Sequence, residues 1–299
     1  MQVKKVVIPV AGWGTRSLPA SKNIPKEMLP IYNKPVVQYV VEEAINAGIK
    51  DVVFITNRDK NVIEDHFDYN LQLEAVLERT GKTELLALVR SVAEMANCIA
   101  VRQKKQLGLG HAVLCAREVV GDNPFAAMVG DDLLFGEASG LEQLLQVASK
   151  EQMPVVGVME VPEAQVSSYG IISGLEIADG IYKIDRLVEK PAVKDAPSNL
   201  AIIGRYILTP DIFDHLATAK PGHGGEIQLT DALQGLAETR GMLAVKIKGK
   251  RYDVGSWVDY LCANVFLGLQ DENIRNVLLP ALEIMLMQQY RKPKAYENE

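Results

Sequence analysis

The stretch that decides the fold is VVIPVAGWGTR, residues 6–16. Its first half is a short, uninterrupted apolar run that ends near Gly12, which is typical of a buried parallel strand. The next regular pattern starts only at Pro35, where apolar residues recur at helical spacing as far as Ile45, and Gly48 ends the helix. The segment therefore predicts a strand, a long loop and a helix, the opening unit of an α/β fold.

Strand and helix patterns alternate along the first half of the chain. Apolar strand patterns occur at residues 49–56, 98–102, 125–129 and 155–161. Helical patterns occur between them, at residues 60–67, 71–94, 112–120 and 141–148. This alternation predicts a doubly wound, mostly parallel, Rossmann-like sheet.

The pattern changes beyond about residue 165. Shorter β-rich pieces follow at residues 169–173, 181–189 and 201–208. They predict a small mixed β sub-domain that is built onto the sheet. Helical patterns then return at residues 226–238, 257–269 and 273–290. We expect C-terminal helices, with a break or kink at Pro280.

Composition and charge exclude several classes of protein. The chain has 299 residues, of which 48% are hydrophobic and 23% charged, so a disordered chain is not expected. The net charge is 32 − 38 = −6, whereas a general nucleic-acid binder needs a basic face. No apolar run approaches the roughly 20 residues of a membrane span. The three cysteines form no C-x-x-C pair. We expect a cytoplasmic protein that binds neither nucleic acid nor membranes.

The loop at residues 12–34 is long for a strand-to-helix connection, and such loops are usually functional. Glycines allow backbone N–H groups to approach an anion, and such nests bind phosphate. The loop has four basic residues and one acid, Glu27, a local charge of +3; the basic residues are Arg16, Lys22, Lys26 and Lys34. A basic, glycine-rich loop after the first strand predicts a nucleotide-phosphate site. The alternative is an ordinary surface loop with solvated lysines.

Two common phosphate motifs are absent from this loop. A Walker A motif needs a glycine five residues after Gly12, where this chain has Ser17. The dinucleotide motif G-x-G-x-x-G lacks its third glycine for the same reason, and Thr56-Asn57 stands where an acid is expected. An oxidoreductase that uses a nicotinamide cofactor is therefore disfavoured.

A set of motifs in the same order resembles the sugar-1-phosphate nucleotidylyltransferases. It covers roughly residues 3–268. The run PKEMLP at 25–30, with Lys34-Pro35, is similar to the bacterial members that use UTP and glucose 1-phosphate. The other motifs are GWGTR at 12–16, Gln103 with GLGHA at 108–112, GDD at 130–132, YGII at 169–172, EKP at 189–191, SNLA at 198–201, GGEIQLTD at 224–231 and YDVG at 252–255.

The resemblance implies that UTP and α-D-glucose 1-phosphate react to UDP-glucose and pyrophosphate, with Mg²⁺ as the cofactor. A phosphate monoester has a second pKa near 6, so the sugar phosphate is already a nucleophile at neutral pH. No serine, cysteine or histidine nucleophile is required. The enzyme has to align two polyanions and stabilise the charge on the leaving pyrophosphate.

The resemblance also implies roles for single residues on the nucleotide side. Arg16 and Lys26 hold the triphosphate, and a planar guanidinium suits the leaving group well. Gln103 suits the edge of uracil, because its amide both donates and accepts hydrogen bonds. Glu27 reaches the ribose, and Asp132 contacts the ribose or holds its loop. The remaining nucleotide-binding residues are Ala11, Gly12, Gly14, Thr15 and Gly108.

On the sugar side the resemblance implies a catalytic role for Lys190, beside the sugar phosphate. Glu189, with Gly170 and Asn199, binds the sugar. Neighbouring residues of a strand point to opposite faces. Glu189 and Lys190 therefore reach one site only at a bulge or a strand end, and Pro191 favours an end.

The predicted Mg²⁺ ligands are Asp131, which follows the strand at 125–129, and Asp253. The carboxyl end of a parallel strand suits such a ligand. The implied organisation is one catalytic domain at residues 1–268, with a nucleotide part at about 1–165 and a sugar-phosphate part at about 166–268. We expect residues 269–299 to form a C-terminal helical extension. Its stretch from Leu278 to Met287 is too apolar for a solvated tail, which predicts a homo-oligomer, a dimer or tetramer; the alternative is packing onto the same subunit.

Two alternatives remain open. A sister transferase would use dTTP or another sugar 1-phosphate. A catalytically silent relative would act as a binding or regulatory subunit, although the charged residues of the motifs argue against it.

Overall fold

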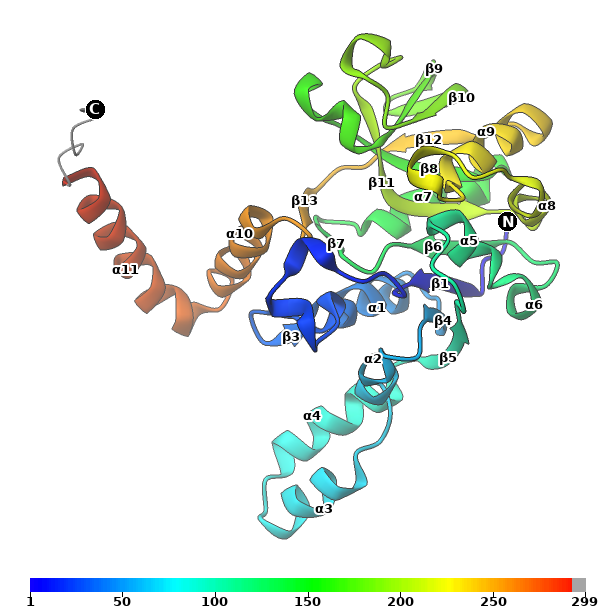
Figure 1. The fold of residues 1–299 in the computed structure, drawn as a ribbon. Coiled ribbons are helices and arrows are strands. Elements are labelled where there is room, and N and C mark those ends of the chain that lie inside the picture. The colour runs from blue at the N-terminus through cyan, green and yellow to red at the C-terminus, as the bar shows by residue number, and fades with distance from the viewer. Residues whose placement is uncertain (292–299) are drawn as a thin grey trace.

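The computed structural model describes residues 1–291, apart from the side chains of residues 223 and 289–291. Its centre is a nine-stranded sheet (Figure 1). The strand order is β5 (Asn97–Arg102), β4 (Asp51–Thr56), β1 (Lys5–Pro9), β6 (Phe125–Met128), β11 (Leu200–Leu208), β8 (Val155–Glu160), β12 (Leu243–Lys246), β10 (Ile181–Glu189) and β9 (Gly170–Ala178). The predicted α/β fold is confirmed.

The sheet is parallel on one side and mixed on the other. Strands β5, β4, β1 and β6 run parallel. Strand β11 then enters antiparallel to both β6 and β8, so the prediction of a mostly parallel sheet is wrong beyond β6. The β-rich pieces predicted for a small sub-domain form β9, β10 and β11 of this same sheet.

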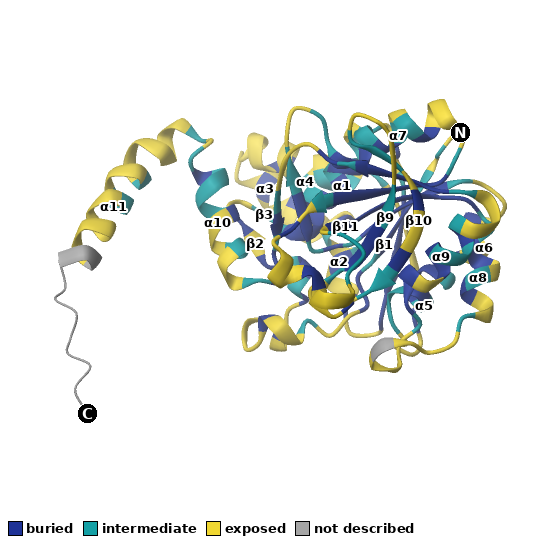
Figure 2. Cartoon of the chain, turned by 90° about the horizontal axis from the view of Figure 1, so that it is seen from above, coloured by how far each residue is buried: buried dark blue, intermediate teal, exposed yellow. Residues whose placement is uncertain are grey.

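Helices cover both faces of the sheet and create two apolar cores. Alternate residues of β1 enter opposite cores: Val6 and Ile8 pack into one, and Val7 into the other. The first core is closed by α1 (Val36–Asn46), α7 (Gly140–Glu151) and α10 (Trp257–Gly268). The second is closed by α5 (Leu109–Leu114), α6 (Arg117–Val120), α8 (Ile212–Thr218) and α9 (Leu229–Arg240). Figure 2 shows the buried sheet between these helices.

A separate two-stranded ribbon joins distant parts of the chain. Strand β7 (Asp132–Phe135) pairs antiparallel with β13 (Lys250–Asp253), which places Asp132 opposite Asp253. The sequence analysis did not predict either strand. The ribbon brings two of the predicted carboxylates to one place.

Two helical segments project from the body (Figure 1). One is the hairpin α3 (Leu71–Arg79) and α4 (Thr83–Glu94), which follows α2 (Asn61–His66). The other is α11 (Glu272–Arg291). Of the break or kink expected at Pro280, the break is wrong, because α11 continues through this proline, and the kink stays a prediction. Proline has no N–H, so the carbonyl of Asn276 lacks its usual hydrogen bond from residue 280. Asn276 lies in an exposed turn of the helix, where water can donate to this carbonyl instead.

The C-terminal extension is described only up to residue 291, so residues 292–299 of that prediction lie outside the described part. Within residues 1–291, no helix has both the length and the apolar character that a membrane crossing requires.

Candidate active site

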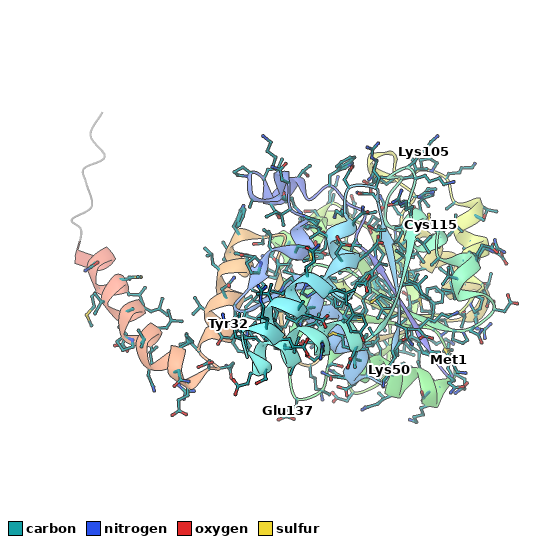
Figure 3. All side chains as sticks on the ribbon, turned by 90° about the horizontal axis from the view of Figure 1, so that it is seen from below. Met1, Tyr32, Lys50, Lys105, Cys115 and Glu137 are labelled. Atoms are coloured by element: carbon teal, nitrogen blue, oxygen red, sulfur yellow. The ribbon has the colours of Figure 1, made fainter. Side chains whose placement is uncertain are left out.

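The loop after β1 folds back on itself. Gly14 adopts φ +67°, and a Cβ there would lie 3.3 Å from the Lys26 Cβ, so glycine allows the two segments to pack closely. The Ser21 hydroxyl donates to the Gly14 carbonyl at 2.7 Å. At the far end of the loop, Tyr32, labelled in Figure 3, donates its hydroxyl to Asp271 at 2.8 Å. The loop is thereby held at both ends.

Asp131 lies just beyond β6, where the chain passes close to β1. A Cβ at Gly130 would come within 2.9 Å of Val10, so this position requires a glycine or a local shift. The carbonyl of Asp131 accepts the N–H of Val254 at 3.0 Å. This bond and the β7–β13 ribbon bring the turn of Asp131 beside Asp253.

The two predicted catalytic cations of the loop face the two predicted metal ligands. The ammonium of Lys26 donates to Asp131. Arg16 lies 3.8 Å from Asp131 and 3.6 Å from Asp253. Two cations therefore face two carboxylates. The structure brings these four predicted residues together.

Opposite charges set the protonation of this cluster. Burial alone would lower the pKa of Lys26, but Asp131 and Glu27 outweigh it and raise the pKa above its usual value. Burial alone would raise the pKa of Asp131, but Lys26 and Arg16 hold it below the usual range. Both groups are therefore charged at neutral pH.

The residues predicted for the sugar side, Glu189 and Lys190, lie at the end of β10. The strand ends at Glu189, and Lys190 adopts the left-handed conformation, with φ +45°. Both side chains consequently line one cavity, and their charged atoms lie 3.5 Å apart. The predicted strand end is confirmed. The Thr230 hydroxyl donates to Glu189 at 2.6 Å, and Gly170 pairs with Glu189 across the ladder.

Arg251 is the main site residue that the sequence analysis missed. Its guanidinium faces both carboxylate oxygens of Asp132, with Nε 2.8 Å from Oδ1 and an Nη 2.9 Å from Oδ2. Its other Nη donates to the Tyr169 hydroxyl at 3.1 Å. A signal was present, because Arg251 lies two residues before Asp253 on one strand, and such residues share a face.

Asp132 consequently has a partner within the protein. Burial raises its pKa to about 7, while Arg251 acts in the opposite direction. Glu27 also has a partner within the protein: it is 1% exposed and accepts a hydrogen bond from the Lys60 ammonium at 2.7 Å. Burial raises the pKa of Glu27 and lowers that of Lys60. The binding roles predicted for these two acids stay predictions.

Two cavities of about 380 and 250 Å³ meet at Asp131, with Leu109 and Val129 also common to both. The larger one is lined by the predicted nucleotide residues Ala11, Gly12, Gly14, Thr15, Lys26, Glu27, Gln103 and Gly108. The smaller one is lined by Arg16, Asp132, Gly170, Glu189, Lys190 and Asp253. Asn199 is exposed and lines neither cavity. Its predicted role in sugar binding stays a prediction.

Gln103 and Gly108 form one corner of the larger cavity. The Gln103 amide donates to the Gly108 carbonyl at 3.2 Å and lies 2.9 Å from Nδ1 of His111. Gly108 has φ +102°, and a Cβ there would meet Glu226 at 2.7 Å. This crowding explains the need for glycine at a turn that borders the cavity.

Comparison with known proteins identifies the architecture. The sequence profile described as "Nucleotidyl transferase" matches residues 5–269, nearly the whole chain. The chain belongs to the nucleotidyl transferase family. The cavities and the charge cluster therefore lie inside the region that this family defines.

Several proteins are similar to the chain over almost its full length. The UTP–glucose-1-phosphate uridylyltransferase of Bacillus subtilis (strain 168) is 48% identical over 285 residues, which is 95% of this chain and 98% of that protein. A crystal structure of UDP-glucose pyrophosphorylase with UDP-glucose is 44% identical with a TM-score of 0.83, over 90% of this chain and 100% of that one. A UTP-bound UGPase from Acinetobacter baumannii is 38% identical with a TM-score of 0.87, over 94% and 99%.

Proposed function

We propose that this nucleotidyl transferase converts UTP and α-D-glucose 1-phosphate to UDP-glucose and pyrophosphate. The observation that carries the proposal is the pair of cavities that meet at Asp131, with Lys26 at one and Lys190 at the other. A triphosphate and a sugar phosphate need such adjoining sites if the phosphate of one is to reach the α-phosphorus of the other. The names of the similar full-length proteins support the choice of UTP and glucose 1-phosphate.

The reaction needs alignment and charge stabilisation. A phosphate oxygen of the sugar phosphate forms a bond to the α-phosphorus of UTP while the bond from that phosphorus to the β-phosphate oxygen breaks, and pyrophosphate leaves. Lys190 neutralises the incoming phosphate, which lowers the repulsion between two polyanions. Arg16 and Lys26 stabilise the charge on pyrophosphate as it departs. Glu189, held by Thr230, accepts hydrogen bonds from the sugar hydroxyls.

The donor set fits a Mg²⁺ ion. Mg²⁺ prefers oxygen ligands and is usually held by one or two carboxylates together with substrate phosphates. Asp131 lies where the two cavities meet and Asp253 lines the smaller one, with both carboxylates within 3.8 Å of Arg16, and the pKa of Asp131 is held low. The cations and carboxylates of the cluster already balance, so polyanionic substrates require added positive charge. A bound Mg²⁺ would supply it.

The test is to incubate the purified protein with Mg²⁺ and UTP or dTTP, together with a panel of sugar 1-phosphates, and to measure pyrophosphate. We expect release with UTP and glucose 1-phosphate. Preference for dTTP or another sugar would indicate the sister transferase. No release with any pair would indicate the catalytically silent relative.

We further propose that the protein works in the cytoplasm as a homo-oligomer through α11. Figures 1 and 2 show this helix extending away from the body with an exposed surface. Val277, Met285 and Met287 are 74%, 60% and 62% exposed, which is high for such apolar side chains. A second copy of the chain would bury them. Light scattering at micromolar concentration should give a dimer or tetramer, and a monomer would contradict the proposal.

The division of residues 1–268 into a nucleotide part and a sugar-phosphate part is also part of the proposal. The larger cavity is lined mainly by residues before about 165, whereas the smaller one takes many of its residues from the later segment. Residue 226 in the larger cavity and residues 16, 109, 129 and 131–132 in the smaller one cross this division, so the two parts share the site.

A further inference from the structure

Arg205 is a fully buried charge that the proposed reaction does not use. It is 0% exposed in the middle of β11. Its guanidinium donates to both oxygens of Glu43 on α1, with the shortest bond at 2.7 Å. Glu43 also accepts the N–H of Leu141 at the start of α7 at 2.9 Å. The pair therefore ties the sheet to the two helices that cover one face.

A local irregularity of β11 aims Arg205 at this place. The register between β11 and β8 shifts between Ile202 and Tyr206. Gly204, inside the shift, has φ +64°, and a Cβ there would clash with the side chain of Val129. Bulges that re-aim a side chain are frequent beside active sites.

The guanidinium of Arg205 also contacts the turn that contains Asp131. One Nη donates to the carbonyl of Asp132 at 2.7 Å, and the second donates to the carbonyl of Gly204 at 3.3 Å. That Gly204 carbonyl also accepts the N–H of Val129 at 3.0 Å. Arg205 thus holds the chain on both sides of the two residues Gly130 and Asp131.

We propose that Arg205, oriented by Glu43, is a positioning residue that fixes the turn Val129–Asp132 and thereby the direction of the Asp131 carboxylate. The inference rests on the proposed function, because it assigns Asp131 to the metal. A buried ion pair contributes little net stability compared with apolar residues of similar volume. A metal ligand, by contrast, has to be held to within about 0.5 Å. The pair is therefore explained by geometry at the site.

The test removes both charges at once. The double variant Glu43→Leu/Arg205→Met replaces the ion pair with apolar side chains, and we expect it to fold with a thermal midpoint close to that of the parent. We expect its kcat to fall by about 10–100-fold, the usual effect of losing a residue that supports a metal ligand. The concentration of Mg²⁺ for half-maximal rate should rise, while the KM for glucose 1-phosphate changes little.

A second measurement does not depend on turnover. Titration of Mn²⁺ in the presence of UTP alone, followed by electron paramagnetic resonance, should show about tenfold weaker binding in the double variant. Ile207→Ala on the same strand is the control, because it empties space at another fully buried position that touches neither cavity. It should lower the thermal midpoint and leave Mn²⁺ binding unchanged.

Parental kcat and Mn²⁺ binding in the folded double variant would overturn the inference. Should that variant fail to fold, Arg205→Lys decides in its place. It keeps the charge but cannot reach Glu43 and the Asp132 carbonyl together, so the same two losses are expected, and their absence overturns the inference. Failure of the proposed function is distinguishable, because the parent protein itself would then release no pyrophosphate.

Discussion

The two sides of the site are built in opposite ways. One side rests mainly on a continuous segment, the loop at residues 12–34, which supplies Lys26 to the larger cavity and Arg16 to the smaller one. The other side, the wall of the smaller cavity, is assembled from β7, the end of β10 and β13, so Asp132, Lys190 and Arg251 come from distant parts of the chain. The loop side is also more open: the Arg16 side chain is 64% exposed, and that of Arg251 is 15% exposed.

This difference indicates a division of tasks. An open loop with an exposed arginine suits a group that has to close over UTP and release pyrophosphate. A buried, hydrogen-bonded wall suits a group that fixes the sugar phosphate in one orientation. Asp131 is common to both cavities, so changes at this position should affect both tasks.

The largest effect is expected at Asp131. Asp131→Asn keeps the shape but removes the charge that pairs with Lys26 and that would hold the proposed Mg²⁺. We expect the rate of pyrophosphate release to fall below detection, and excess chelator to have the same effect on the parent protein. Asp122→Asn, at an exposed turn before β6, is the matched control and should retain the parental rate. Full activity in chelator would refute the metal assignment.

Lys190→Ala tests the sugar side alone. Removing the ammonium leaves the repulsion between the two polyanions uncompensated, so kcat should fall by about 10³-fold. Binding of UTP, measured by calorimetry, should stay nearly intact, because Lys190 lies in the smaller cavity. Lys183→Ala, at an exposed position of the same strand, is the control. A loss of UTP affinity as large as the loss of rate would contradict the separation of the two sides.

Glu27→Gln tests whether the loop depends on its buried ion pair. The substitution leaves the ammonium of Lys60 buried without its carboxylate, and such a loss costs about 3 kcal/mol or more. Urea unfolding should show this decrease in the free energy of unfolding. The double variant Glu27→Gln/Lys60→Met should recover most of it. Equal stability of the single variant and the parent would show that the pair does not hold the loop.

Trp13 should give the smallest effect, a spectroscopic one. Its side chain is 65% exposed and borders the larger cavity. Trp257→Phe leaves Trp13 as the sole indole, since the chain has two tryptophans. Adding UTP with Mg²⁺ should change its emission, because loop closure alters its exposure to water. No change at saturating nucleotide would mean that Trp13 does not sense the site.

Local patterns were sufficient for most elements of the fold. The apolar run at β1, the helical spacing of α1 and the parallel strands that follow were predicted near their observed bounds. The strand end at Glu189 followed from Pro191 and the alternation of side chains. The ribbon β7–β13 was missed, because each strand is short and is stabilised by a partner more than 100 residues away.

The sequence by itself determined the chemistry available at the site: a basic glycine-rich loop, the carboxylates Asp131 and Asp253, and Lys190 at the end of a strand. Of the four basic residues in the loop, Lys34 pairs with Glu42 at 2.9 Å and Lys22 lines another cavity. The tertiary structure alone decided which of these groups meet. Pairing between distant strands places Arg251 beside the Asp132 carboxylate. Strand pairing also buries Arg205 next to the Asp132 carbonyl. Such contacts depend on the closing of long loops of chain, which no short-range pattern of residues encodes.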